Sequence, residues 1–151
     1  MNIKSKKNIV IKIGTTSIIK NNKVDSTLLN KLVEIVKEYS NLYNFVIVTS
    51  GAVGLGASKL NYKSRPKSLK KLQVASAVGQ IELINQYEKV FNKSKINIAQ
   101  VLITKNLIDD REQFVNTTQA LNELLSEGII PVVNENDVVA TEELKFGDND
   151  R

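Results

Sequence analysis

The sequence contains no cysteine and no histidine among its 151 residues. Without cysteine there can be no disulfide, no thiolate nucleophile and no zinc–thiolate site. Without histidine, the commonest general base and metal ligand is also excluded. Any chemistry that this chain performs must therefore use lysine, aspartate, asparagine, serine, threonine or backbone amides.

Long apolar runs are missing too. No run approaches the ~18 residues that would indicate a membrane helix. The basic residues 1–7 lead directly into a strand-like segment, without the apolar core or cleavage site of a signal peptide. We therefore expect a cytoplasmic protein with no membrane partner.

Arginine and aromatic residues are scarce, although the formal net charge is +5. Arginine occurs only at Arg65, Arg111 and Arg151, and aromatic residues make up 5% of the chain. Bidentate phosphate contacts use arginine, and base stacking uses aromatic rings. The charge therefore indicates a solvated lysine-rich surface, and no nucleic-acid partner is expected.

What the sequence does contain is an alternation of short apolar runs with amphipathic stretches. Residues 8–13, 45–49, 98–103 and 129–133 are rich in β-branched residues and predict four strands. These strands are apolar on both faces and are separated by helical patterns. They predict an α/β fold, a three-layer sandwich with a mainly parallel open sheet.

Helices are predicted after Asp25-Ser26, over residues 54–60, over residues 68–92, and around residues 114–125 with Gly128 as the stop. Apolar residues at helical spacing mark one face of the first helix and one of the long helix. They are Leu28, Leu32, Ile35 and Tyr39 in the first, and Val74, Val78, Ile81, Ile84, Tyr87 and Phe91 in the second.

A polar turn follows the first predicted strand. Lys12 lies near the carboxyl end of this strand and is followed by Gly14 and three hydroxyl residues, beginning with Thr15. Glycine lets backbone N–H groups approach phosphate oxygens, and an ammonium group offsets their charge. The turn therefore suits a phosphate; the alternative is a lysine that reaches solvent before an ordinary turn.

A glycine-rich turn follows the second predicted strand. It fails as a P-loop because Ala57 stands where the lysine must be. It also fails as a dinucleotide fingerprint, because Gly51, Gly54 and Gly56 have the reverse spacing. The remaining interpretation is a strand-to-helix turn whose N–H groups suit a carboxylate or phosphate. Close packing is the alternative explanation of the glycines.

Two acidic, amide-rich clusters come after the fourth predicted strand. They are Asn134, Asn136 and Asp137, and then Asp148, Asn149 and Asp150. They lack the register of an EF-hand and suit a metal, an ammonium group or contacts between their own loops, with a solvated loop as the alternative.

The polar turns after the first, second and fourth strands should meet at one edge of a parallel sheet, which would place a basic cradle opposite an acidic pocket. Phosphoryl transfer to a carboxylate fits this arrangement, because an acid of pKa ~4 is already ionised at neutral pH and needs no base.

Six motifs also carry a resemblance to a known family. In chain order they are Lys12-Ile-Gly-Thr, Val48-Thr-Ser-Gly-Ala-Val, Ala77-Val-Gly-Gln, Asp110-Arg-Glu-Gln-Phe, Val133-Asn-Glu-Asn-Asp and Phe146-Gly-Asp-Asn-Asp. Together they resemble the glutamate 5-kinases of the amino-acid kinase family, from about Ile9 to Arg151. These enzymes make γ-glutamyl phosphate from ATP and L-glutamate in the first step of proline biosynthesis.

The resemblance implies a role for each matching residue. Lys12, with the amides of Gly14 and Thr15, would hold the transferring phosphoryl group of ATP, and Asp150 would orient Lys12. The residues that would bind glutamate are Ser50, Gly51, Ala52, Asn134, Asp137, Asp148 and Asn149. By its chemistry, Asp137 suits the α-ammonium group of glutamate, whereas Ser50 and amide donors suit its carboxylates.

The resemblance also implies partners and limits. Mg²⁺ would accompany ATP with no protein ligand assigned, and the intact protein is expected to form a homo-oligomer and to be a candidate for proline feedback. Members of the family continue past the last motif into the half that binds adenine. Residues 1–151 are therefore expected to be the amino-acid-binding portion of a single kinase domain, without the nucleotide-binding portion, and to be inactive alone. Alternatives are a kinase of this fold for another carboxylate or carbamate, and a non-catalytic amino-acid-binding module.

Overall fold

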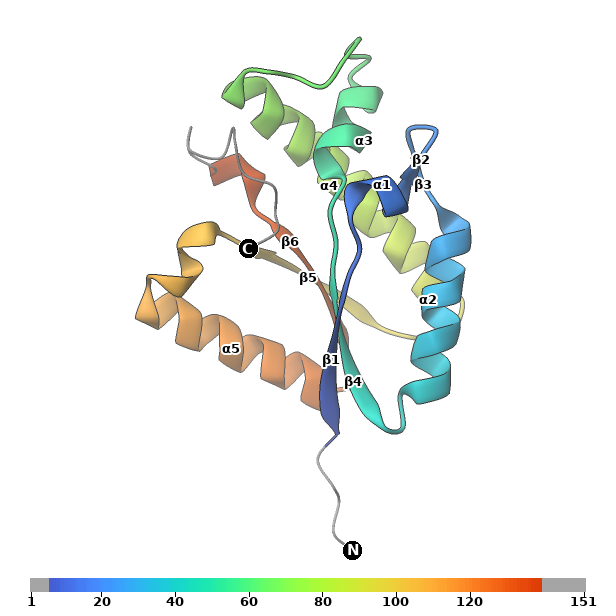
Figure 1. Cartoon of the computed structure of the whole chain (residues 1–151). Helices are drawn as coiled ribbons and strands as arrows, with labels where there is room; N and C mark the ends of the chain where they lie inside the picture. The colour runs from blue at the N-terminus through green and yellow to red at the C-terminus, as the bar shows by residue number, and fades with distance from the viewer. Residues whose placement is uncertain (1–5, 140–151) are drawn as a thin grey trace, which may run out of the picture.

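Four parallel strands form the central sheet of the computed structural model, which describes residues 6–139. In spatial order they are β1 (Lys7–Lys12), β4 (Tyr43–Val48), β6 (Ile130–Glu135) and β5 (Ile98–Ile103). Because all neighbouring pairs are parallel, the carboxyl ends of all four strands share one edge, here called the carboxyl edge (Figure 1). All four strands were predicted, and the parallel sheet is confirmed.

Helices cover both faces of this sheet. They are α1 (Thr15–Ile18), α2 (Ser26–Tyr39), α3 (Ala52–Lys59), α4 (Leu69–Asn92) and α5 (Arg111–Ser126), with 3₁₀ turns η1 (Lys105–Ile108) and η2 (Asp137–Val139). Helices α2 and α4 lie on one face and α5 lies on the other, so the three-layer α/β sandwich is also confirmed (Figure 1). No helix within residues 6–139 is both long and apolar enough to cross a membrane.

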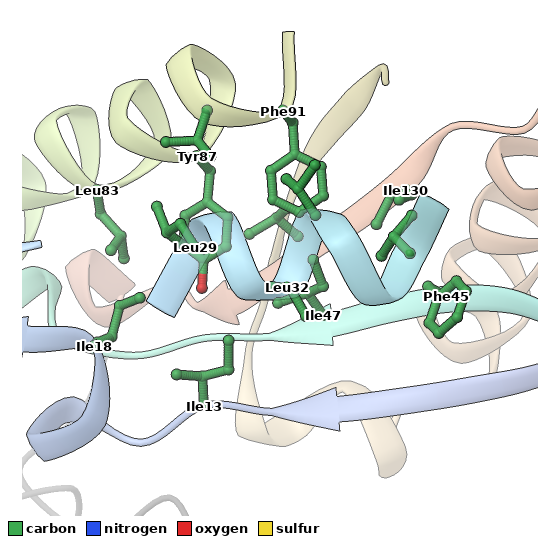
Figure 2. Close-up of a cluster of buried hydrophobic side chains, with 14 of the residues drawn as sticks. Ile13, Ile18, Leu29, Leu32, Phe45, Ile47, Leu83, Tyr87, Phe91 and Ile130 are labelled. Carbon is green, nitrogen blue, oxygen red and sulfur yellow. The ribbon is translucent and has the colours of Figure 1, made fainter. Parts of the chain in front are cut away.

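The hydrophobic core lies between the sheet and the α2–α4 layer. Figure 2 shows Leu29 of α2 and Leu83 of α4 among the apolar side chains that meet Ile47 of the sheet, and all three are fully buried. Alternate residues of each strand face this core. On the other face of the outer strand β1, the side chain of Val10 is 64% exposed.

The predicted helix faces are partly wrong. Ile35 and Tyr39 of α2 are 46% and 40% exposed, and Val74 and Ile81 of α4 are 49% and 60% exposed. The buried residues are instead Leu29, Leu32, Val33 and Val36 in α2, and Ala75, Ser76, Gly79, Leu83, Tyr87, Val90 and Phe91 in α4. The buried face of α4 includes the small residues Ala75, Ser76 and Gly79, which the spacing of large apolar residues does not reveal.

Helices α2 and α4 begin where they were predicted to begin, and a side chain caps each of them. Asp25 accepts hydrogen bonds from the N–H groups of Thr27 (2.9 Å) and Leu28 (3.3 Å), and Ser68 caps α4. Helix α5 ends shortly before Gly128, whose positive φ of +73° favours glycine at the end of a helix.

A small hairpin between α1 and α2 was not predicted. Its strands are β2 (Ile19–Lys20) and β3 (Lys23–Val24), and they pair antiparallel. The turn residues Asn21 and Asn22 have φ values of +50° and +59°. Asparagine tolerates this left-handed conformation, which two-residue hairpin turns require.

Strand β6 continues two residues beyond its predicted end at Val133. Asn134 therefore lies inside the strand, paired in register with Leu102, and does not follow it. Pro131 is accommodated inside this strand because pairing with β4 begins only at Val132. Proline has no N–H group to donate, and at Pro131 no hydrogen bond between β4 and β6 needs one.

Helices α3 and α4 touch through their backbones at two glycines. A Cβ atom added at Gly56 would lie 1.7 Å from the carbonyl oxygen of Ala75, and one at Gly79 would lie 1.8 Å from that of Ala52. Neither neighbour is a flexible side chain that could move away. Only glycine fits at these two positions.

We expect Gly56→Ala to destabilise the fold by about 1–3 kcal/mol or more, because the added methyl group forces two helix backbones apart. Gly54→Ala is the matched control in the same helix, since a Cβ there meets nothing within 4 Å. It should be neutral or stabilise by up to about 1 kcal/mol through helix propensity. Urea unfolding measures both, and equal effects would contradict the backbone contact.

Candidate active site

The polar turns meet at the carboxyl edge because the strand ends lie in register. Lys12 of β1 pairs with Val48 of β4, which in turn pairs with Val133 of β6. The ladder continues one residue further, since the N–H group of Thr49 donates to the carbonyl oxygen of Val133 at 2.9 Å. The ends of β1, β4 and β6 therefore lie side by side (Figure 1).

The first turn has room beside it. Lys12, the last residue of β1, is exposed, and Thr15 begins α1 directly after Gly14. Gly14 has an ordinary φ of −73°, and a Cβ there would meet nothing within 4 Å. Neither backbone strain nor packing within the described residues requires glycine here. A bare Gly14 leaves open space next to the amides that were predicted to hold phosphate.

Ser50 connects the first turn to the second. Its hydroxyl lies 2.9 Å from the hydroxyl of Thr15 and donates to the carbonyl oxygen of Ile13 at 3.3 Å. A residue predicted to bind substrate and one predicted to bind phosphate are thus in direct contact. The first and second turns are therefore joined by a contact between side chains.

The second turn is held tightly from the hairpin side. Gly51 has a φ of +105°, and a Cβ there would lie 2.9 Å from Ile19 of β2. Helix α3 then begins at Ala52, which is 2% exposed. The positive φ therefore explains Gly51 and close packing explains Gly56, whereas neither explains Gly54.

The third turn, which here means the end of β6 from Asn134 to the start of η2 at Asp137, is held by helix α4. Asn134 is 5% exposed and its Nδ2 donates to Oε1 of Gln80 at 2.7 Å. Asp137, the first residue of η2, accepts a hydrogen bond from the Ser76 hydroxyl at 2.6 Å. Neither α4 partner was predicted as a site residue. The available signal was two polar residues at i and i+4 on one helix face.

Negative charge accumulates next to this third turn. Burial raises the pKa of Glu135, and the nearby charge of Asp137 raises it further, against an opposing effect of Lys105. Burial and a nearby like charge both disfavour the ionised form of a carboxyl group. A cation such as an ammonium group would favour the ionised form of Glu135.

The remaining predicted site residues, Asp148, Asn149 and Asp150, lie outside the described residues. Within residues 6–139, His, Cys, Asp and Glu nowhere gather in groups of three or more that could hold a metal ion. Asn136, from the same cluster as Asp137, extends the sheet by donating its N–H to the carbonyl oxygen of Ile103 at 2.7 Å.

A buried hydrogen bond supports the Ser50 turn from below. The Tyr87 hydroxyl of α4 donates to Oγ1 of Thr49 at 2.9 Å, and both side chains are buried. Burial raises the pKa of Tyr87 to about 12, so the hydroxyl stays protonated at neutral pH. Helix α4 thus contacts both the Ser50 turn and the Asp137 turn.

An open parallel sheet with polar turns gathered at its carboxyl edge defines a class of α/β proteins that bind ligands at this edge. Two solved structures share the fold. An isopentenyl phosphate kinase superimposes with a TM-score of 0.54 at 16% identity, covering 84% of this chain and 56% of that one. The UMP kinase from Ureaplasma parvum gives a TM-score of 0.54 at 18% identity, covering 85% and 55%.

The chain belongs to the amino acid kinase family, whose model matches residues 7–151. A glutamate 5-kinase from Prochlorococcus marinus (strain MIT 9301) is 50% identical over 144 residues, which cover 93% of this chain and 40% of that protein. A glutamate 5-kinase from Rippkaea orientalis is 46% identical over 148 residues, covering 96% and 40%. The chain thus spans about 40% of the length of these relatives.

We expect Tyr87→Phe to cost about 1 kcal/mol of unfolding free energy, because it removes the bond to Thr49. Thr49→Val should cost more, about 1–3 kcal/mol, since it leaves the tyrosine hydroxyl buried without a partner. The double variant should be less destabilised than the sum of the two single variants. Urea unfolding of the four proteins measures this coupling, and strict additivity would contradict the hydrogen bond.

Proposed function

We propose that the protein to which this chain contributes transfers the γ-phosphoryl group of ATP to the side-chain carboxylate of L-glutamate. The contact between the Thr15 and Ser50 hydroxyls is the observation that carries the proposal. It joins a turn suited to phosphate to a turn suited to a carboxylate. The identity of about 50% to glutamate 5-kinases supports glutamate as the substrate.

The phosphate side of the proposed site is the first turn. Lys12 would neutralise charge on the transferring phosphoryl group, and the amides of Gly14 and Thr15 would donate to its oxygens. The open space beside Gly14 supports this assignment. ATP would bring Mg²⁺ on its phosphates, since the residues of this turn offer no carboxylate to hold the ion.

The glutamate side would be the second and third turns. The amides of Gly51 and Ala52 would donate to a carboxylate, as would the Ser50 hydroxyl once it turns away from the carbonyl oxygen of Ile13, and Asp137 would accept from the α-ammonium group. The proximity of Glu135 to Asp137, seen in the effect of Asp137 on the pKa of Glu135, supports this, because two neighbouring acidic groups attract an ammonium group. Asn134 would complete the pocket, together with Asp148 and Asn149.

The proposed reaction needs no general base. The γ-carboxylate of glutamate is already ionised at neutral pH, so its oxygen is a nucleophile without losing a proton. The task of the protein is then to hold two anions together with an ammonium group and amide dipoles. A chain without histidine is compatible with this chemistry.

Residues 1–151 would form the amino-acid-binding portion of one kinase domain, and the remaining 60% of the relatives' length would supply the nucleotide site. Asp150 would orient Lys12. Proline feedback and assembly into a homo-oligomer remain predictions that rest on the resemblance, and a cytoplasmic location remains a prediction from the sequence alone.

Asp137→Asn should weaken L-glutamate binding by about 10- to 100-fold, because it removes the negative charge that faces the ammonium group. Isothermal titration calorimetry of the chain with glutamate, aspartate and proline measures this. The matched control is Glu88→Gln, an exposed carboxylate on α4. Unchanged glutamate affinity in Asp137→Asn would overturn the assigned pocket, and preference for aspartate or proline would overturn the assigned substrate.

Residues 1–151 alone should bind glutamate without forming γ-glutamyl phosphate. Activity is expected in a chimera whose residues 7–151 replace the matching part of the P. marinus relative. In this chimera, Lys12→Ala should lower kcat by about 10²- to 10³-fold and leave the KM for glutamate nearly unchanged. Trapping the product with hydroxylamine gives the rates.

The matched control for that experiment is Lys7→Ala, an exposed lysine at the opposite end of the same strand. It should leave both kinetic constants unchanged. Equal losses in kcat and in glutamate affinity for Lys12→Ala would instead place Lys12 in the glutamate pocket. Turnover by residues 1–151 alone would contradict the proposed division of the domain.

A further inference from the structure

Two side chains of α4 form hydrogen bonds with two polar side chains of the third turn, one that accepts and one that donates. The Ser76 hydroxyl donates to Oδ2 of Asp137 at 2.6 Å, and Oε1 of Gln80 accepts from Nδ2 of Asn134 at 2.7 Å. In both cases the partners are far apart in sequence, by 61 and 54 residues. These bonds therefore fix the turn against the helix and do not merely stabilise the turn internally.

Ser76 leaves Asp137 able to bind a ligand. An ionised carboxylate has about four acceptor sites, and the hydroxyl occupies only one of them on Oδ2. Ser76 is itself 3% exposed, so it cannot turn to water instead. Its one donor thus sets the rotation of the carboxylate and leaves Oδ1 to accept from a cationic group.

Gln80 fixes the orientation of a neighbouring amide. A carboxamide has a donor end and an acceptor end, and Asn134 is nearly fully buried. Because the Nδ2 group of Asn134 donates to Gln80, the side-chain carbonyl oxygen of Asn134 must point away from Gln80. An acceptor and a carboxylate are therefore both presented from the end of β6 in fixed orientations.

Helix α4, which carries Ser76 and Gln80, is also packed directly against the second turn, where α3 begins. Gly79 lies between Ser76 and Gln80 in sequence and touches the carbonyl oxygen region of Ala52, where α3 begins. A single turn of α4 therefore contacts the second turn through Gly79 and the third turn through Ser76 and Gln80. The two turns cannot shift independently without breaking one of these contacts.

From this geometry we infer that Ser76 and Gln80 are positioning residues for substrate recognition. They orient Asp137 and Asn134 so that the site accepts the α-ammonium group of an amino acid and discriminates against acids that lack it. The inference rests on the proposed function, because it assumes that glutamate occupies this site. It adds a source of specificity that comes from α4 and not from the turns themselves.

The test compares L-glutamate with glutarate, which has the same two carboxylates and no ammonium group. Binding of each to residues 1–151 is measured by calorimetry or by NMR titration. Ser76→Ala should raise the Kd for glutamate about tenfold and change the Kd for glutarate less than about twofold. In an Asp137→Asn background, Ser76→Ala should have little further effect, because it acts through Asp137.

Gln80→Met is the second variant, and it should also raise the Kd for glutamate several-fold. Gln86→Met is its matched control on the same helix, since the Gln86 amide donates to Oε1 of Glu82 within α4, at 2.8 Å, and not to the third turn. Thermal unfolding of each variant verifies that the fold is retained. The control should bind both ligands like the unchanged chain.

The outcomes separate the inference from the proposed function. If the unchanged chain binds glutamate but Ser76→Ala weakens glutamate and glutarate equally, the role of Ser76 is structural and the inference is wrong. The same conclusion follows if Gln80→Met behaves like Gln86→Met. If the unchanged chain does not prefer glutamate to glutarate at all, the proposed glutamate site fails, and the inference fails with it.

Discussion

The backbone contact between α3 and α4 is the constraint on which the site depends. At Gly56 and Gly79 the helices approach so closely that no side chain fits between them. Contacts between side chains can adjust by changing rotamers, whereas a contact between backbones cannot. The start of α3, with Gly51 and Ala52, is therefore held at a fixed distance from the polar face of α4.

Polar side chains extend this constraint to the other elements. Thr15 contacts Ser50, Thr49 accepts from Tyr87, and the third turn is held through Asp137 and Asn134. Each of these bonds joins two different elements, and no buried polar side-chain atom among the described residues lacks a partner. The Tyr87–Thr49 bond is buried, so breaking it would leave a desolvated group unpaired. The bonds of Asp137 and Asn134 are partly buried, and the Thr15–Ser50 contact is exposed.

Much of this arrangement could be predicted from the sequence, for local physical reasons. Runs of β-branched residues mark the strands, and Asp25 and Ser68 mark helix starts because their side chains cap free N–H groups. The polar turns were placed at one edge because parallel strands share their carboxyl ends. These features depend on a few neighbouring residues.

The features that sequence reasoning missed depend on partners distant in the chain. The buried face of α4 contains Ala75, Ser76 and Gly79, which become a packing surface only where α3 touches it. Likewise, the roles of Ser76 and Gln80 follow only from their hydrogen bonds to side chains of η2 and β6. Asn134 looked like a loop residue, yet its pairing with Leu102 and its bond to Gln80 place it inside a strand.

The position of β1 has a consequence for how the chain behaves in solution. As an outer strand of the four-stranded sheet, it has an edge with no partner among the described strands, and Val10 on it is largely exposed. An unpaired strand edge is a template on which another chain can add a strand. Lys6 precedes this strand, and Lys7 and Lys12 are its first and last residues, so repulsion between like charges opposes such pairing. Since salt screens that repulsion, self-association of the chain should increase with ionic strength.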